Sequence, residues 1–177
     1  MKIVVLSGSP RKGGNTEMLV EAFVEGASLK HTVEVVSVND YDLRPCVGCD
    51  VCFGPGNRCP QKDDMALVYE KLAGAEMLVI ASPVYFYGLS AQLKAVVDRL
   101  HNPIRNTFHI RKMALLLVGA ATLPELFDSI LTQYQLCLNF FRLEDAGKVL
   151  VKGVREKGKI VDTGALREAY DLGCSIL

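Results

Sequence analysis

The fold is decided near the amino end of the chain, by the stretch Ser7-Gly8-Ser9-Pro10-Arg11-Lys12-Gly13-Gly14-Asn15-Thr16. This stretch follows the apolar run Lys2–Leu6 and leads into Thr16–Leu29, where apolar residues recur at helical intervals. Small residues allow the backbone to curl tightly, and a helix start offers unpaired N–H groups and the positive end of the helix dipole. The pattern therefore predicts a strand, an anion-binding loop and a helix.

The donors in this loop suit a single terminal phosphate. They are the hydroxyls of Ser9 and Thr16, the Asn15 amide and the Arg11 guanidinium, with Gly14 beside them. The G-x-G-x-x-G spacing of dinucleotide-binding loops is missing, and no Gly-Lys-Ser/Thr follows at the offset of a nucleotide P-loop. A monophosphate such as FMN fits better than ATP or NAD. The alternative is a plain turn that uses glycine for its geometry.

The rest of the chain alternates apolar runs with amphipathic segments. Further strands are predicted at His31–Val38, Met77–Ala81, Met113–Val118 and Gly147–Val151. Further helices are predicted from Asp63 or Asp64 to Ala73 and at Gly88–His101, Pro124–Leu138 and Asp162–Leu172. Five strands separated by helices imply an α/β domain over residues 1–177, a doubly wound parallel sheet of order 2-1-3-4-5 with helices on both faces.

An aromatic loop, Ser82-Pro83-Val84-Tyr85-Phe86-Tyr87-Gly88, follows the third strand. In a sheet of this order the ligand crevice lies at the carboxyl ends of the first and third strands, so this loop is expected to face the phosphate loop. Its aromatic side chains could flank a planar ring system. The small residues that begin at Gly119, after the fourth strand, would let that ring approach the backbone. The alternative is that the aromatic side chains fill the core beneath the loop.

Four cysteines lie within the long irregular stretch 39–62, at Cys46, Cys49, Cys52 and Cys59. The C-x2-C-x2-C spacing can turn three thiolates toward one centre, and the fourth, followed by Pro60, can close a [4Fe-4S] site. Two alternatives remain open. Structural zinc favours two separated C-x2-C pairs, and the thiols could also be free or form a redox disulfide.

Composition excludes several classes of function. The chain has 177 residues, with 20 basic and 20 acidic side chains and a formal net charge of zero. This balance argues against nucleic-acid binding. No apolar run reaches the roughly 20 residues that span a bilayer, and the first residues are too short for a signal peptide. We expect a cytoplasmic protein with reduced thiols. A solvated edge hairpin is predicted for one basic stretch near the carboxyl end, which contains Lys148, Lys152, Arg155, Lys157 and Lys159.

Two motifs and the segment after the aromatic loop carry a family resemblance. The motifs are Gly8–Thr16 and Ser82–Tyr85, and the segment is Leu89-Ser90-Ala91-Gln92-Leu93-Lys94-Ala95-Val96-Val97-Asp98-Arg99. Together they resemble the NADPH-dependent FMN reductase branch of the flavodoxin-like superfamily, over about residues 1–160. The cysteines resemble those of the iron–sulfur flavoproteins. The resemblance implies that Ser9, Arg11, Asn15 and Thr16 hold the FMN phosphate and that Pro83–Tyr87 contact the isoalloxazine.

The resemblance also implies an activity. It predicts a redox flavoprotein that moves electrons between NAD(P)H or another small-molecule or protein donor, FMN and a [4Fe-4S] cluster. It further implies a homodimer or homotetramer. We nominate no catalytic side chain, because the cofactors carry the chemistry. The alternatives are a cluster-free NAD(P)H-dependent FMN or quinone reductase, and a non-enzymatic electron carrier or redox sensor.

Overall fold

The computed structural model describes residues 1–177, which form a five-stranded, all-parallel sheet of order β2-β1-β3-β4-β5. The predicted doubly wound α/β fold and strand order are thus confirmed. The strands are β1 (Lys2–Ser7), β2 (Thr32–Ser37), β3 (Met77–Pro83), β4 (Lys112–Val118) and β5 (Glu144–Val151). The helices are α1 (Asn15–Ala27), α2 (Met65–Ala73), α3 (Ala91–Arg99), α4 (Asp128–Phe141) and α5 (Ala165–Ser175).

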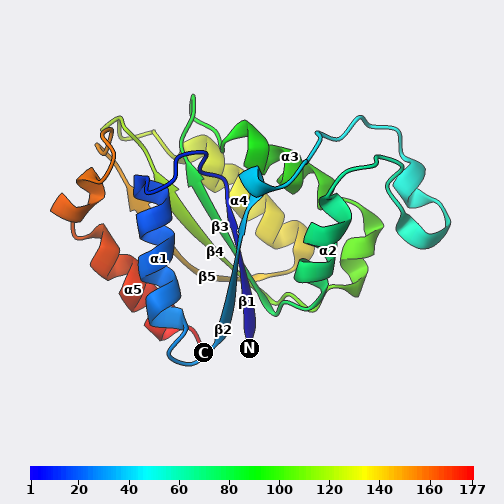
Figure 1. The fold of residues 1–177 in the computed structure, drawn as a ribbon, viewed down its shortest axis with the longest axis horizontal. Coiled ribbons are helices and arrows are strands. Elements are labelled where there is room, and N and C mark those ends of the chain that lie inside the picture. Colours follow the sequence, from blue (N-terminus) through cyan, green and yellow to red (C-terminus); the bar gives the residue numbers. More distant parts are fainter.

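Helices cover both faces of the sheet. Figure 1 shows α1 and α5 on one side and α2, α3 and α4 on the other. Side chains alternate along each strand, so β1 sends Val4 and Leu6 into the core under α2–α4 and Ile3 and Val5 into the core under α1 and α5. Strands buried on both faces read as continuous apolar runs, which explains why they could be recognised in the sequence.

The boundaries of some elements differ from the prediction. Helix α3 begins at Ala91 rather than Gly88, because residues 85–88 form a tight turn and the Ser90 hydroxyl accepts a hydrogen bond from the Leu93 amide. Strand β5 begins at Glu144 rather than Gly147, and it pairs with β4 across a register shift at Met113/Ala114. Both differences arise because local hydrogen bonding, and not apolar periodicity, sets an element's ends.

Two glycines let α1 and α5 approach each other closely. A Cβ on Gly26 would lie 2.1 Å from the Tyr170 carbonyl oxygen, and one on Gly173 would lie 2.3 Å from that of Phe23. Any larger residue would force the helices apart. This contact packs the C-terminal helix against the helix that follows the phosphate loop.

The predicted basic edge hairpin is wrong. Strand β5 is a parallel edge strand that pairs only with β4, and the chain then turns at Gly153, whose φ is +73°. Lys148 lies on β5, whereas Arg155 and Lys157 belong to the loop that follows. The chain enters β5 through the crossover helix α4, and after β5 it continues into α5 without a further strand, so no partner strand exists for a hairpin.

The cysteine-rich stretch between β2 and α2 contains short 3₁₀ turns at Val38–Asp40, Val51–Phe53 and Pro55–Asn57. Figure 1 shows this segment, in cyan, extending beyond α2 on the side away from α1 and α5. None of the helices is both long and apolar enough to cross a membrane.

Candidate flavin and cysteine sites

The phosphate loop lies between β1 and α1, at the carboxyl edge of the sheet. Ser9, Arg11, Gly14, Asn15 and Thr16 all line one cleft of about 220 Å³. Gly14 precedes α1, and no side chain caps the helix. The first-turn N–H groups of α1 therefore remain available to a ligand, at the positive end of the helix dipole.

The Thr16 hydroxyl is the clearest unused donor in this loop. Thr16 is only 3% exposed, it lines the cleft, and its hydroxyl forms no hydrogen bond within the protein. The Ser9 hydroxyl, in contrast, accepts a hydrogen bond from the Arg11 amide at 3.3 Å. A hydroxyl that opens onto a cleft and has no hydrogen-bond partner in the protein fits an acceptor supplied by a ligand, such as a phosphate oxygen. The loop therefore suits the phosphate of FMN.

Asn15 holds a neighbouring loop in addition to lining the cleft. Its Nδ2 donates a hydrogen bond to the Glu156 carbonyl at 2.7 Å, and its Oδ1 accepts one from the Ile160 amide at 3.3 Å. The side chain thus connects the phosphate loop to the segment after β5. Asn15 was predicted as a phosphate donor. The structure shows that its oxygen and one of its amide hydrogens serve this tertiary contact.

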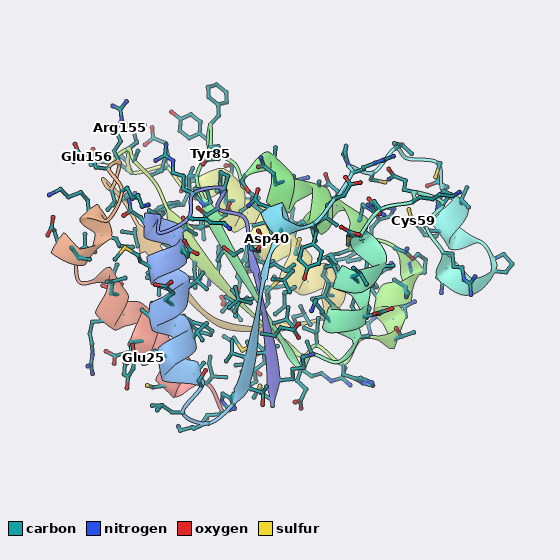
Figure 2. The ribbon with its side chains drawn as sticks, viewed as in Figure 1. Glu25, Asp40, Cys59, Tyr85, Arg155 and Glu156 are labelled. Atoms are coloured by element: carbon teal, nitrogen blue, oxygen red, sulfur yellow. The ribbon has the colours of Figure 1, made fainter.

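The aromatic loop after β3 divides into two parts. Pro83, Val84 and Tyr85 line the same cleft as the phosphate loop. Phe86 and Tyr87 do not line it, and Phe86 is 98% exposed. Figure 2 shows Tyr85 at the end of the sheet that also carries Arg155. The sequence predicted all five residues as flavin contacts; the structure places three of them beside the phosphate loop, and Phe86 and Tyr87 form the tip of the aromatic loop.

The tip is a tight turn with an unusual backbone. Tyr85 and Gly88 exchange two backbone hydrogen bonds of 3.0 Å, and Phe86 and Tyr87 between them have φ values of 46° and 63°. Such a turn normally takes asparagine and glycine, because positive φ is unfavourable for bulky residues. Strain of this kind persists where the surrounding structure imposes it, and it concentrates at ligand sites.

The phosphate loop packs directly on the start of α3. A Cβ on Gly8 would lie 2.5 Å from the Ser90 hydroxyl and 2.6 Å from Leu93 Cβ. The Ser82 hydroxyl accepts a hydrogen bond from the Ser90 amide at 3.0 Å, and Ser82 and Ser90 are fully buried. These contacts fix the phosphate loop relative to the aromatic loop. They explain why the two Ser-containing motifs, far apart in sequence, form one site.

Two residues near the cleft lie in positions that differ from those predicted from the sequence. Gly119 does not line the cleft, although its neighbours Val118 and Ala120 do. Arg155 does line it, whereas the sequence predicted a solvated hairpin at this residue. The signal that could have found it is the strand order, because the loops after parallel strands all emerge at the same edge of the sheet.

The four cysteines of the 46–59 loop lie far from this cleft. Figure 2 shows Cys59 on the opposite side of the molecule from Arg155. All four are free thiols; Cys46 and Cys49 are exposed, Cys52 is buried and Cys59 is partly buried. No three of the chain's Cys, His, Asp and Glu side chains converge on a point that could hold a metal ion. The donor chemistry of four thiols on one loop suits an iron–sulfur cluster, and burial, together with the neighbouring Cys59, Cys46 and Cys49, raises the pKa of the Cys52 thiol.

Cys59 lies beside a buried ion pair. The Nη2 atom of Arg99 donates a hydrogen bond to Cys59 Sγ at 3.4 Å and one to Asp63 Oδ1 at 3.1 Å. Burial raises the pKa of Asp63, but the hydrogen bonds from Arg99 and the Arg44 amide outweigh burial and hold this pKa below its usual value. Asp63 is therefore ionised at neutral pH, and the Arg99 charge is compensated.

Comparison with known proteins agrees with this geometry. Residues 1–144 match the family model described as NADPH-dependent FMN reductase. An iron–sulfur flavoprotein of Methanocaldococcus jannaschii is 43% identical over 112 residues, which are 63% of this chain and 57% of that protein. A Bacillus subtilis protein named as an NAD(P)H-dependent FMN-containing oxidoreductase is 27% identical, and the match covers 97% of this chain and 96% of that protein. The chain thus matches little more than half of the archaeal relative's length.

Solved structures support the fold. An NAD(P)H:quinone oxidoreductase from Methanothermobacter marburgensis superposes with a TM-score of 0.78 at 18% identity, covering 98% of this chain and 96% of that one. An FMN-dependent NADH-azoreductase from Bacillus anthracis, solved with FMN, gives a TM-score of 0.69 at 14% identity, covering 98% of both chains. At these identities the likeness concerns the architecture of the chain.

Proposed function

Because this chain belongs to the NADPH-dependent FMN reductase family, we propose that it is an FMN-dependent oxidoreductase that takes electrons from NAD(P)H and passes them to a small-molecule or protein acceptor. One observation carries the proposal. Ser9, Arg11 and Thr16 line a cleft whose other wall is Pro83–Tyr85. A phosphate bound by Ser9, Arg11 and Thr16 would bring an attached flavin ring toward Pro83–Tyr85.

The residues of the cleft bind and orient the cofactor. Arg11, the Thr16 hydroxyl and the first amides of α1 would hold the phosphate, and Val84 and Tyr85 would contact the ring. FMN, when bound, supplies the chemistry of accepting and releasing electrons. No side chain of the cleft is assigned as an acid or base. The only carboxylate hydrogen-bonded to the loop, Glu17, accepts a hydrogen bond from the Gly13 amide and so has a structural role.

Two measurements test the proposal. The purified protein should be yellow, or should bind added FMN at micromolar concentration in a fluorescence titration. Under steady-state conditions it should oxidise NADH or NADPH in the presence of a quinone or dye. A protein that binds no FMN contradicts the proposal. One that binds FMN but shows negligible NAD(P)H turnover is instead an electron carrier.

We further propose that Cys46, Cys49, Cys52 and Cys59 bind a [4Fe-4S] cluster. The names of several archaeal relatives, four free thiols on one loop, and hydrogen bonds to two of the sulfur atoms support this. Those bonds come from the Gly48 amide to Cys46 Sγ at 3.5 Å and from Arg99 to Cys59 Sγ. Backbone and guanidinium N–H groups are donors that stabilise anionic sulfur.

Metal analysis of anaerobically purified protein tests the cluster. We expect about four iron and four sulfide per chain, with loss of both in Cys59→Ser. Cys137→Ser is the matched control, because Cys137 is also partly buried but lies on α4, outside the loop. Zinc in place of iron, or no metal under strict anoxia, contradicts the cluster and leaves the flavin site unaffected.

A further inference from the structure

The segment that follows β5 is fastened to the wall of the flavin cleft. The Gly119 amide donates to the Val151 carbonyl at 2.8 Å, and the Val154 amide donates back to the Gly119 carbonyl at 3.0 Å. The Gly153 amide donates to the Ala121 carbonyl at 3.0 Å. These bonds join the loops after β4 and β5, so they fix the position of the backbone immediately before Arg155.

The same segment is fastened on its other side by the phosphate loop. Asn15 binds the Glu156 carbonyl and the Ile160 amide, as described above. Val154 is only 6% exposed and packs into the core under α1 and α5. The backbone at Arg155 is therefore held between two anchors, one on the loop after β4 and the other at the start of α1.

The charges at this end of the cleft are unpaired. Arg11 and Arg155 line the cleft, and neither takes part in any of the ion pairs of the chain. Lys157 also lacks an ionic partner, and its Nζ lies 3.1 Å from the position of a Cβ on Gly13. An exposed guanidinium with no ion pair to break can turn onto an anion at little cost. Arg11, Arg155 and Lys157 are thus three cations without an ion pair in or beside the phosphate loop, and Glu17 is the only carboxylate hydrogen-bonded to that loop.

We propose that Arg155 is a phosphate-binding residue, which acts with Arg11 on the phosphate of FMN. This inference rests on the proposed function. A phosphate monoester carries about −1.5 to −2 charges at neutral pH, so a single guanidinium does not neutralise it. Arginine offers two parallel N–H donors to phosphate oxygens, and such charge-assisted bonds are stronger than neutral ones. Arg11 comes from the loop after β1 and Arg155 from the loop after β5, so the two approach the cleft from different elements.

This role makes a specific prediction about ligand preference. Arg155 should increase the affinity for FMN but not for riboflavin, which has the same ring and no phosphate. Loss of a residue that merely supports the loop would lower the affinity for both ligands, because both need the ring site. The difference between the two affinities therefore separates phosphate binding from a structural role.

The experiment titrates FMN and riboflavin into the apoprotein of the wild type and three variants. In Arg155→Gln we expect FMN affinity to fall roughly tenfold and riboflavin affinity to stay the same. Arg155→Lys should recover part of the FMN affinity, because it keeps the charge and loses the two-pronged geometry. The control is Lys159→Gln, which removes the same charge from the same segment; Lys159 does not line the cleft, and its partner is Asp162.

Each result is decisive. Equal FMN affinity in Arg155→Gln and the wild type overturns the inference while leaving the proposed function intact. An equal loss for riboflavin, or an equal loss of FMN affinity in Lys159→Gln, also overturns it. A wild-type protein that binds no FMN overturns both the inference and the proposed function. A loss confined to FMN in Arg155→Gln supports the inference.

Discussion

Arg99 and Asp63 form an ion pair inside the protein, with side chains only 3% and 1% exposed. Arg99 is the last residue of α3, and Asp63 lies two residues before α2. Arg99 also donates to the Arg44 carbonyl at 3.0 Å, and the Arg44 amide donates to Asp63 at 2.9 Å. The pair therefore attaches both ends of the cysteine-rich loop, at Arg44 and Asp63, to α3, beside Cys59.

Removing the negative partner should destabilise the fold. Asp63→Asn would leave the Arg99 charge buried without compensation, and breaking such a pair typically costs about 3 kcal/mol or more. We expect this loss in the free energy of unfolding measured with urea. The control is Asp171→Asn, which breaks an exposed ion pair with Arg167 and should have little effect. Equal losses in the two variants would contradict the assignment.

The same pair should make stability fall in acid. The pKa of Asp63 in the folded protein is below its ordinary value, so the unfolded chain takes up a proton first. The stabilisation is present above the unfolded pKa of about 3.9, and it is lost as the pH falls from there through the folded pKa. The difference in unfolding free energy between wild type and Asp63→Asn should therefore shrink between neutral pH and about pH 3. A difference that is constant with pH would rule out this linkage.

Gly8→Ala should damage both stability and flavin binding. The added Cβ would lie within 2.6 Å of Leu93 Cβ and closer still to the Ser90 hydroxyl, so the phosphate loop must move. Overpacking of this kind costs roughly 1–3 kcal/mol. Thermal melting and FMN titration measure the two effects. Gly164→Ala is the control, because the nearest atom lies 4.0 Å away; a similar loss there would remove the steric explanation.

Arg11→Ala should weaken FMN binding, by roughly tenfold, because it removes a charge-assisted contact to the phosphate. Riboflavin affinity should be unchanged. Lys12→Ala provides a comparison, since Lys12 is the adjacent cation and does not line the cleft. If the two variants bind FMN alike, the phosphate assignment fails.

Relief of the strained turn should stabilise the protein. Phe86 is almost fully exposed at a φ of 46°, so replacing it removes little packing. Asparagine tolerates this region and β-branched residues do not, so Phe86→Asn should raise the melting temperature and Phe86→Val should lower it. A strained backbone conformation costs about 1–3 kcal/mol, which sets the scale of the difference. Indistinguishable variants would show that this turn carries no strain.

The confirmed parts of the sequence interpretation rest on periodicity and on strongly biased local motifs. Apolar runs such as Met113–Val118 identify strands buried on both faces, and regular alternation with helices leaves few topologies for a parallel sheet. The motifs at Gly8–Thr16 and Ser82–Tyr85 were read correctly as two loops of one cleft. The proposed cysteine ligands remain a prediction, because the four thiols do not converge on one point.

The misplaced residues depend on contacts between distant segments. Arg155 has no motif around it; hydrogen bonds to Asn15, Gly119 and Ala121, together with the buried side chain of Val154, bring its segment to the cleft. Asn15 looked like a simple phosphate donor, because a sequence shows which groups a side chain carries but not which partner occupies them. The burial of Arg99 likewise depends on Asp63, which lies 36 residues away.

The order of residues along the chain was enough to establish the sheet, its crossovers and the location of the phosphate loop, since these follow from short-range periodicity and glycine geometry. Which partner each side chain binds could be learned only from the tertiary structure. A hydrogen bond or an ion pair forms between whichever groups the packing brings within about 3 Å, and that proximity is a property of the whole chain.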